Sequence, residues 1–198
     1  MPVWSGNYYL TQSQMEDNAS YMYYKFKEDG WTDNAISAMF GNIQTESGLN
    51  PGIWEDLKEG NLNKGYGLTQ WSPATRIITW LSDNGYPMGS MDGEIARIIA
   101  EKNNQEEQWY DTPAYPISFL EFSLSNEDIE YLTKAFVYNY ERAKKPDIAT
   151  RVQRANNWYE YLTGLPPTPP TPTYRKMPWI YYIGNAKRRV LRKNGFIR

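Results

Sequence analysis

Before Leu165 the chain consists of short segments in which apolar residues recur at helical spacing, each following a capping residue. Helices this short are marginal on their own and must bury their apolar faces against one another. We therefore expect one domain that is mainly α (α+β), built from packed short helices. The predicted helices begin at Thr11 or Ser13, Thr32, Ser72, Asp92, Ser125 and Asp147, and four of them end near Gly30, Gly48, Gly85 and Gly164. A shorter apolar piece covers residues 117–122.

The segment 52–67, between the second and third predicted helices, differs from the rest. It is rich in glycine and asparagine and shows no helical periodicity. Such a composition is typical of turns, so we expect either a small β-hairpin or an ordered loop. Several short helices around one small hairpin is the layout of a lysozyme-like fold.

A proline-rich stretch, "LPPTPPTPT" (165–173), separates two regions of opposite charge. The predicted domain, residues 1–164, contains all 23 acidic residues, whereas residues 174–198 contain eight of the 21 basic residues and no acidic one. Proline-rich segments form stiff, extended spacers. We therefore expect a domain (1–164), a linker (165–173) and a short basic and apolar tail (174–198).

The chain contains neither cysteine nor histidine. This composition excludes disulfides, Ser-His and Cys-His nucleophiles, and zinc sites of the usual kinds. We expect no metal and no cofactor, so acid–base chemistry near neutral pH must come from carboxyl groups, lysine or tyrosine. The N-terminus does not resemble a secretory signal, and no run of apolar residues is long enough for membrane insertion, so we expect a soluble protein.

Glu46 is the leading candidate for that chemistry. It follows Met39 and Ile43 at helical spacing, so it belongs to the apolar face of its predicted helix. Partial burial and the negative end of the helix dipole both favour a protonated carboxyl, which is what a general acid for glycoside cleavage requires. The simpler alternative is a solvated glutamate near a helix end.

Two further motifs are candidates for substrate binding. In "GYGLTQW" (65–71), glycines permit close approach to a ligand, Gln70 can donate and accept hydrogen bonds, and Trp71 offers a flat face for a sugar ring. The alternative is a glycine turn with Trp71 in the core. In "FVYNYER" (136–142), Glu141 lies on one helical face with Val137 and Tyr138, and a buried partner of an arginine is its preferred interpretation.

The order of these motifs resembles the phage tail lysozyme family, within the goose-type lysozyme and lytic transglycosylase superfamily. The stretches "DGWTDNAISAMFGNIQTESGLNPGIW", "GYGLTQWSPA", "MDGEIARII" and "YERAKKP" carry the resemblance, which extends from about Tyr8 to Gly164. They are similar to the N-terminal lysozyme domain of tail-knob peptidoglycan hydrolases of small Bacillus podophages. Members with this architecture also carry a zinc-dependent endopeptidase domain. Because this chain has no histidine, the resemblance does not imply endopeptidase activity here.

The resemblance implies a lysozyme fold that cleaves the glycan strands of peptidoglycan, with Glu46 as the catalytic acid. It suggests Glu59 as a second carboxylate, with Glu55 and Asp56 as substitutes. The residues expected to bind the saccharide are Tyr66, Gln70, Trp71, Tyr138, Asn139 and Tyr140.

These observations favour a wall-degrading enzyme of the virion tail that assists DNA entry, with residues 174–198 contacting tail proteins. No nucleic acid is an expected partner. The alternatives are an endolysin, a lytic transglycosylase, and a non-catalytic glycan-binding tail component, for which the aromatic content of 16% would also serve.

Overall fold

The computed structural model describes residues 1–103 and 108–167. Within them the chain is mainly helical, as predicted. The helices are α1 Gln12–Glu28, α2 Asp33–Ser47, α3 Thr75–Asp83, α4 Met91–Lys102, α5 Phe119–Leu124, α6 Ile129–Ala135 and α7 Ile148–Thr163, with a 3₁₀ turn η1 Glu55–Leu57 and a π-helical segment η2 Phe136–Glu141. None of the helices in the described part of the chain is long and apolar enough to cross a membrane.

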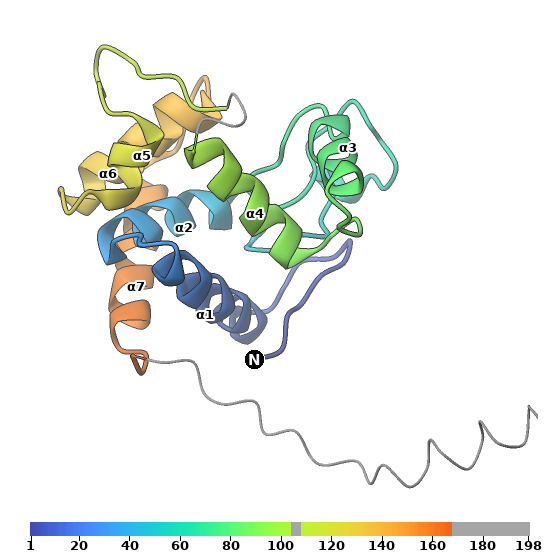
Figure 1. Ribbon diagram of the computed structural model, residues 1–198, viewed down its shortest axis with the longest axis horizontal. Coiled ribbons are helices and arrows are strands. Elements are labelled where there is room, and N and C mark those ends of the chain that lie inside the picture. The colour runs from blue at the N-terminus through green and yellow to red at the C-terminus, as the bar shows by residue number, and fades with distance from the viewer. Residues whose placement is uncertain (104–107, 168–198) are drawn as a thin grey trace, which may run out of the picture.

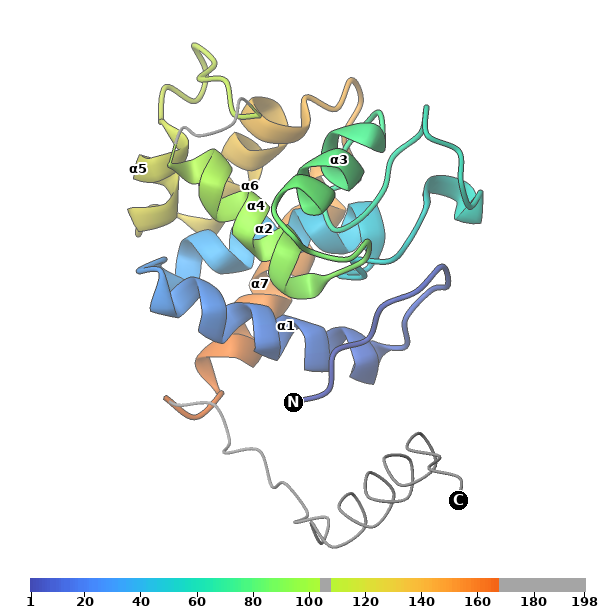
Figure 2. The ribbon, with the colours of Figure 1, turned by 45° about the vertical axis from the view of Figure 1, so that its right-hand side comes forward.

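Helix α2 is the centre of the domain. It packs most extensively against α7 and also contacts α1, α5, α6 and η2. Figures 1 and 2 show α3 and the segment that precedes it on one side of α4, and α5 and α6 on the other. A helix buried on most sides is apolar around its circumference, and ten of the fifteen residues of α2 are buried.

The predicted boundaries of α2 are confirmed. Thr32 precedes the helix in an extended conformation, and its side chain accepts a hydrogen bond from the Ala35 amide at 3.1 Å. Gly48 ends the helix in the left-handed conformation, with φ of 62°, which glycine adopts without steric cost. The helix therefore ends just beyond Glu46, and this side chain lies near the end of a buried helix.

A glycine within α2 allows the closest helix contact in this region. A Cβ atom on Gly41 would lie 2.5 Å from the carbonyl oxygen of Arg151 and 2.7 Å from the amide nitrogen of Ala155, both in α7. Only a residue without a side chain fits this crossing. The contact brings the first two turns of α7 against the second half of α2.

Two predicted capping residues are wrong by two or three positions. Ser90, not Asp92, caps α4 by accepting a hydrogen bond from the Gly93 amide. Asp128, not Ser125, caps α6. In each case the residue that precedes the first helical turn in an extended or similar conformation is the one whose side chain reaches the free amides.

The first and third helices also depart from the prediction. Thr11 caps α1 and forms a capping box with Gln14, which settles the choice between Thr11 and Ser13. Helix α3 begins at Thr75 rather than directly after Ser72, and its N-terminus has no side-chain cap. Asp147, by contrast, caps α7 as predicted, by accepting from the Thr150 amide.

The segment 52–67 is an ordered loop. Its extended pairing consists of the isolated antiparallel bridges Trp54–Tyr66 and Tyr66–Trp71, and the described residues contain no longer β-ladder. Asp56 and Leu57 have positive φ angles within the 3₁₀ turn, a conformation that interrupts strand pairing. The second of the two predicted alternatives is therefore the one adopted.

The chain continues to contact the domain beyond Gly164. Leu165 packs against the hydrophobic core, and the Tyr24 hydroxyl donates a hydrogen bond to the Pro166 carbonyl oxygen at 2.8 Å. The described part of the chain ends at residue 167. The rest of the predicted linker, together with the predicted tail 174–198, lies outside it.

Candidate active site

Glu46 opens onto a groove at the C-terminal end of α2. Its side chain is 26% exposed, whereas Ile43, one turn earlier, is fully buried. The groove has a volume of about 530 Å³, within the usual size of a small-molecule site. Its walls are Tyr9, Thr45, Glu46, Ile53, Trp54, Glu55, Asp56 and Gln70.

Arg151 of α7 holds the buried side of Glu46. Its Nη2 atom lies 2.5 Å from Oε1 of Glu46, and its Nη1 atom lies 2.6 Å from Oε2 of Glu141. Nη1 also donates to Oδ1 of Asn42 at 3.0 Å. The arginine side chain is 5% exposed, so one buried guanidinium connects two carboxyl groups from different helices.

Glu141 is the buried member of this group. It ends the π-helical segment η2, and its side chain is 5% exposed. Burial raises the pKa of Glu141 well above the ordinary value for glutamic acid, and the negative charge of Glu46 raises it further, against the opposing effect of Arg151. The prediction that Glu141 is a buried partner of an arginine is confirmed.

The loop 65–71 presents Gln70 to the groove. Gln70 has a φ angle of 50°, and its side-chain amide donates to the carbonyl oxygens of Ile53 and Gly67 at 3.2 and 2.9 Å. Gly67 is required here, because its φ is 80° and a Cβ atom would lie 2.7 Å from the carboxyl oxygens of Glu94. Buried Glu94 in turn accepts the Leu68 amide at 2.7 Å. The glutamine is thus fixed by the loop that carries it.

Trp71 and Tyr140, expected to bind the saccharide, lie in the interior at 2% and 1% exposure. Both donate hydrogen bonds to the buried carboxyl of Glu101, Trp71 through Nε1 at 3.0 Å and Tyr140 through its hydroxyl. Arg97 supplies the charge that balances Glu101, at 2.7 Å. The alternative interpretation of Trp71 as a core residue agrees with this position.

The remaining predicted binding residues do not line the groove either. Tyr66 is 2% exposed and packs on Trp54. Asn139 is fully buried; its side chain accepts from Thr112 and donates to the Tyr115 carbonyl oxygen. Tyr138 is 37% exposed and stacks on Tyr115 with ring centroids 5.6 Å apart. Of the six predicted binding residues, Gln70 shares the groove with Glu46.

Among the candidate second carboxylates, the structure favours the two substitutes. Glu55 and Asp56 line the groove, whereas Glu59 is exposed and outside its lining. Lys64, at 2.6 Å, and the Gly65 amide, at 2.8 Å, lower the pKa of Glu55. Lys58 lowers the pKa of Asp56. Both groups are therefore carboxylates near neutral pH.

Arg151 is the main site residue that the sequence interpretation missed. It lies three residues after Ile148 and four before Ala155, on the apolar face of α7, which is the same signal that singled out Glu46 on α2. When a basic residue lies on the apolar face of one helix and an acidic residue on the apolar face of another, the two can form a buried ion pair. The described residues contain no group of three or more acidic side chains that could hold a metal ion.

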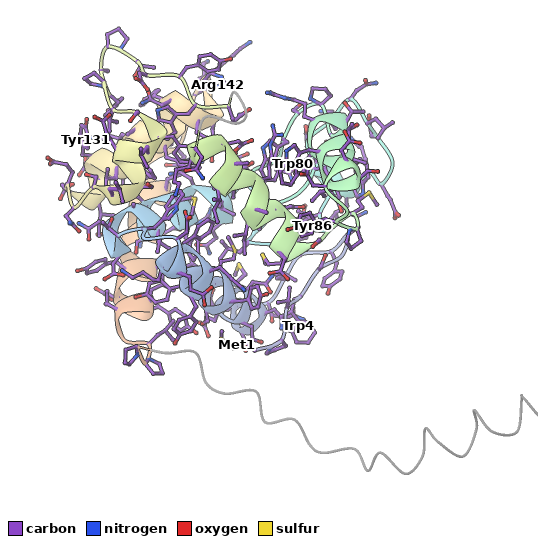
Figure 3. The ribbon with its side chains drawn as sticks, in the orientation of Figure 1. Met1, Trp4, Trp80, Tyr86, Tyr131 and Arg142 are labelled. Carbon is purple, nitrogen blue, oxygen red and sulfur yellow. The ribbon has the colours of Figure 1, made fainter. Side chains whose placement is uncertain are left out.

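Two partly buried aromatic residues outside the groove form a separate pair. Trp80 and Tyr86 stack with ring centroids 6.3 Å apart beside α3 and α4, and both are labelled in Figure 3. They belong to a different depression from the one that contains Glu46. The groove at Glu46 brings together the three acidic side chains of Glu46, Glu55 and Asp56.

Comparisons with known proteins show the family to which the chain belongs. A relative, "Morphogenesis protein 1" of Bacillus phage B103, is 41% identical over 161 residues, which are 81% of this chain and 43% of the relative. The chain thus spans less than half the length of that protein. The family model for phage tail lysozyme matches residues 17–162, a range that includes α2, the loop 65–71 and α7. The chain belongs to the phage tail lysozyme family.

Proposed function

We propose that this chain is a phage-borne peptidoglycan hydrolase that cleaves the glycan strands of the bacterial cell wall, with Glu46 as the general acid. The observation that carries the proposal is the placement of Glu46, half-buried at the end of α2, in a groove that also contains Gln70 and the carboxylates Glu55 and Asp56. A proton donor and an ionised carboxylate facing one groove are the two groups that glycoside cleavage requires.

In this mechanism Glu46 gives its proton to the glycosidic oxygen as the bond to the anomeric carbon breaks. Glu55 or Asp56 stabilises the positive charge that develops on the sugar or accepts a proton from the attacking water. Gln70, held rigidly by Ile53 and Gly67, is placed to bind the saccharide through its remaining hydrogen-bonding capacity. Arg151 stabilises the carboxylate that Glu46 becomes after proton transfer.

We further propose that the enzyme acts from the virion tail and assists DNA entry. The family and the phage relative support a tail context. In this proposal residues 174–198 contact tail proteins through the apolar run "WIYYIG" and its flanking basic residues.

Product analysis of digested cell walls tests the function. Purified peptidoglycan incubated with the protein should lose turbidity and release fragments with ordinary reducing ends. A lytic transglycosylase would instead release fragments one water lighter, with an anhydro ring, which mass spectrometry distinguishes. Intact glycan strands after prolonged incubation would contradict catalysis and favour a glycan-binding tail component.

Replacing Glu55 by glutamine should remove the acidic limb of the pH profile. Because Lys64 and Gly65 lower the pKa of Glu55, its carboxylate is present at neutral pH, and a step that needs it fails as pH falls through that lowered value. The measurement is the rate of wall clearing between pH 3 and pH 8. Glu59→Gln is the matched control and should retain the wild-type profile. If Glu59→Gln lost the acidic limb and Glu55→Gln kept it, Glu59 would be the second carboxylate. If Asp56→Asn alone lost the limb, the role would belong to Asp56.

A further inference from the structure

A second acid stands directly behind Glu46. Glu141 and Glu46 contact the same guanidinium, through different nitrogen atoms, at 2.6 and 2.5 Å. One of the two carboxyl groups is closed off from solvent, at 5% exposure, and the other opens onto the groove, at 26%. The arrangement is thus asymmetric: the buried acid can reach a substrate only through the exposed one.

Two carboxyl groups and one arginine leave an unbalanced charge if both acids are ionised. Oε1 of Glu141 is buried and finds no hydrogen-bond donor among the described residues. The neighbouring acid is Glu46. Two ionised carboxylates are both acceptors, so a hydrogen bond between Glu46 and Glu141 requires a proton on one of them. Two carboxyl groups that contact one guanidinium disfavour being charged together, so a proton on one of them stabilises the arrangement.

The other charged groups nearby do not compensate for this. Glu46 from α2 and Arg151 from α7 are the charged groups that act on the Glu141 carboxyl. Arg142, the next residue, donates to the Gln108 carbonyl oxygen and lies over the Tyr110 ring at the edge of the domain, as Figure 3 shows by its label. Lys134 of α6 pairs with Glu130.

We propose that Glu141 is a positioning residue of the catalytic site: it holds, in the buried half of a carboxyl pair, the proton that Glu46 presents to the glycosidic oxygen. This inference rests on the proposed role of Glu46. The shared proton first moves from Glu141 to Glu46. Glu46 then gives it to the leaving oxygen, and both groups are left as carboxylates facing Arg151. The water that attacks the anomeric carbon loses one proton, and the pair regains one proton from it directly or by way of Glu55 or Asp56, so that the cycle balances.

The π-helical segment is what places Glu141 there. The Arg142 amide donates to the Val137 carbonyl oxygen, an i to i−5 bond of 2.7 Å. Such widened turns shift the following side chains relative to an ordinary helix and occur often at functional sites. Burial raises the pKa of Glu141, which favours the protonated form that the proposal assigns to it.

The first test is the pH profile of Glu141→Gln, measured as the rate of wall clearing. Glutamine keeps the shape but stores no proton, and Arg151 then faces Glu46 alone. The basic limb should move to lower pH by about one unit or more, with a loss of roughly 10-fold or more at pH 7 and recovery in acid. Glu130→Gln, in the exposed pair with Lys134, is the control and should not move the profile. A loss by the same factor at every pH would show a merely structural role and overturn the proposal.

The second test needs no activity and no change at Glu141. Carboxyl carbon signals of the full chain are titrated by nuclear magnetic resonance, in the wild type and in Glu46→Gln. Removal of the neighbouring charge should lower the titration midpoint of Glu141 by about one pH unit or more. An unchanged midpoint would refute the coupling. If Glu46→Gln still cleared walls, the proposed function would fail while the coupling could still be observed, so the two failures are distinguishable.

Discussion

Wall clearing by the Glu46→Gln variant is expected to fall by about 10² to 10⁴-fold, because the amide has no proton to transfer to the glycosidic oxygen. The fold should persist. The amide oxygen can still accept the hydrogen bond from Arg151, and Arg151 keeps its contacts with Glu141 and Asn42. The measurement is the initial rate of turbidity loss, with the melting temperature recorded for the same samples.

A matched control removes the same kind of charge elsewhere. Glu160 is exposed on α7, and it is outside the lining of the groove. Glu160→Gln should therefore clear walls at the wild-type rate. A Glu46→Gln protein that matched this control in rate would remove Glu46 from the mechanism, whatever its melting temperature.

The part of the site that could be predicted from the sequence is the part fixed by local structure. Helix α2 begins after a threonine cap and ends at a left-handed glycine, and both signals depend only on neighbouring residues. The helical spacing of Met39, Ile43 and Glu46 then places the carboxyl on the buried face. No long-range information is needed for any of these steps, and each is confirmed except the catalytic role, which stays a prediction.

The aromatic residues show where such reasoning ends. A tryptophan that stacks on a sugar and one that fills a core look the same in a motif. Trp71 is in the interior because its Nε1 finds Glu101, 30 residues away, and Tyr140 reaches the same carboxyl from 39 residues away. Buried rings with a polar atom need such partners. These pairings are set by the packing of α4 against its neighbours and leave no local signal.

The choice among Glu55, Asp56 and Glu59 could not be made from the sequence, for a related reason. All three are acidic residues of one irregular loop, and the resemblance placed the weight on Glu59. The 3₁₀ turn with positive φ at Asp56 and Leu57 directs the chain so that Glu59 leaves the groove. Backbone conformations of this kind are determined by contacts with distant segments, such as the hydrogen bond from the Asn7 side chain to the Leu57 carbonyl oxygen.

The buried acid–arginine group was predictable only in part. Glu141 was expected to have an arginine partner, and the identity of that arginine depends on the crossing of α2 and α7. Arg151 is 105 positions from Glu46 in the sequence and 10 positions from Glu141. The helix crossing itself depends on Gly41, which offers no signal in a helical pattern except an unfavourable propensity.

Gly41→Ala is therefore expected to have the largest effect on stability of the substitutions considered. An alanine in the middle of a helix is ordinarily stabilising relative to glycine by up to about 1 kcal/mol. Here its Cβ would lie 2.5 Å from one backbone atom of α7 and 2.7 Å from another, so α7 must move. Overpacking of this kind costs roughly 1–3 kcal/mol and more when backbone must shift. We expect a net loss of about 2 kcal/mol and, for a domain of this size, a melting temperature lower by about 4–8 °C.

The same substitution should lower activity out of proportion to stability. The carbonyl oxygen that the new methyl group meets belongs to Arg151, whose side chain holds Glu46. A displacement of about 1 Å at a catalytic group can cost about 10²-fold in rate. Gly164→Ala is the matched control, because its Cβ would meet nothing closer than 3.5 Å; it should retain both the melting temperature and the rate of wall clearing. If Gly41→Ala were as stable as this control, the close crossing of α2 and α7 would be wrong. If it were destabilised but fully active when folded, the position of Glu46 would not depend on Arg151.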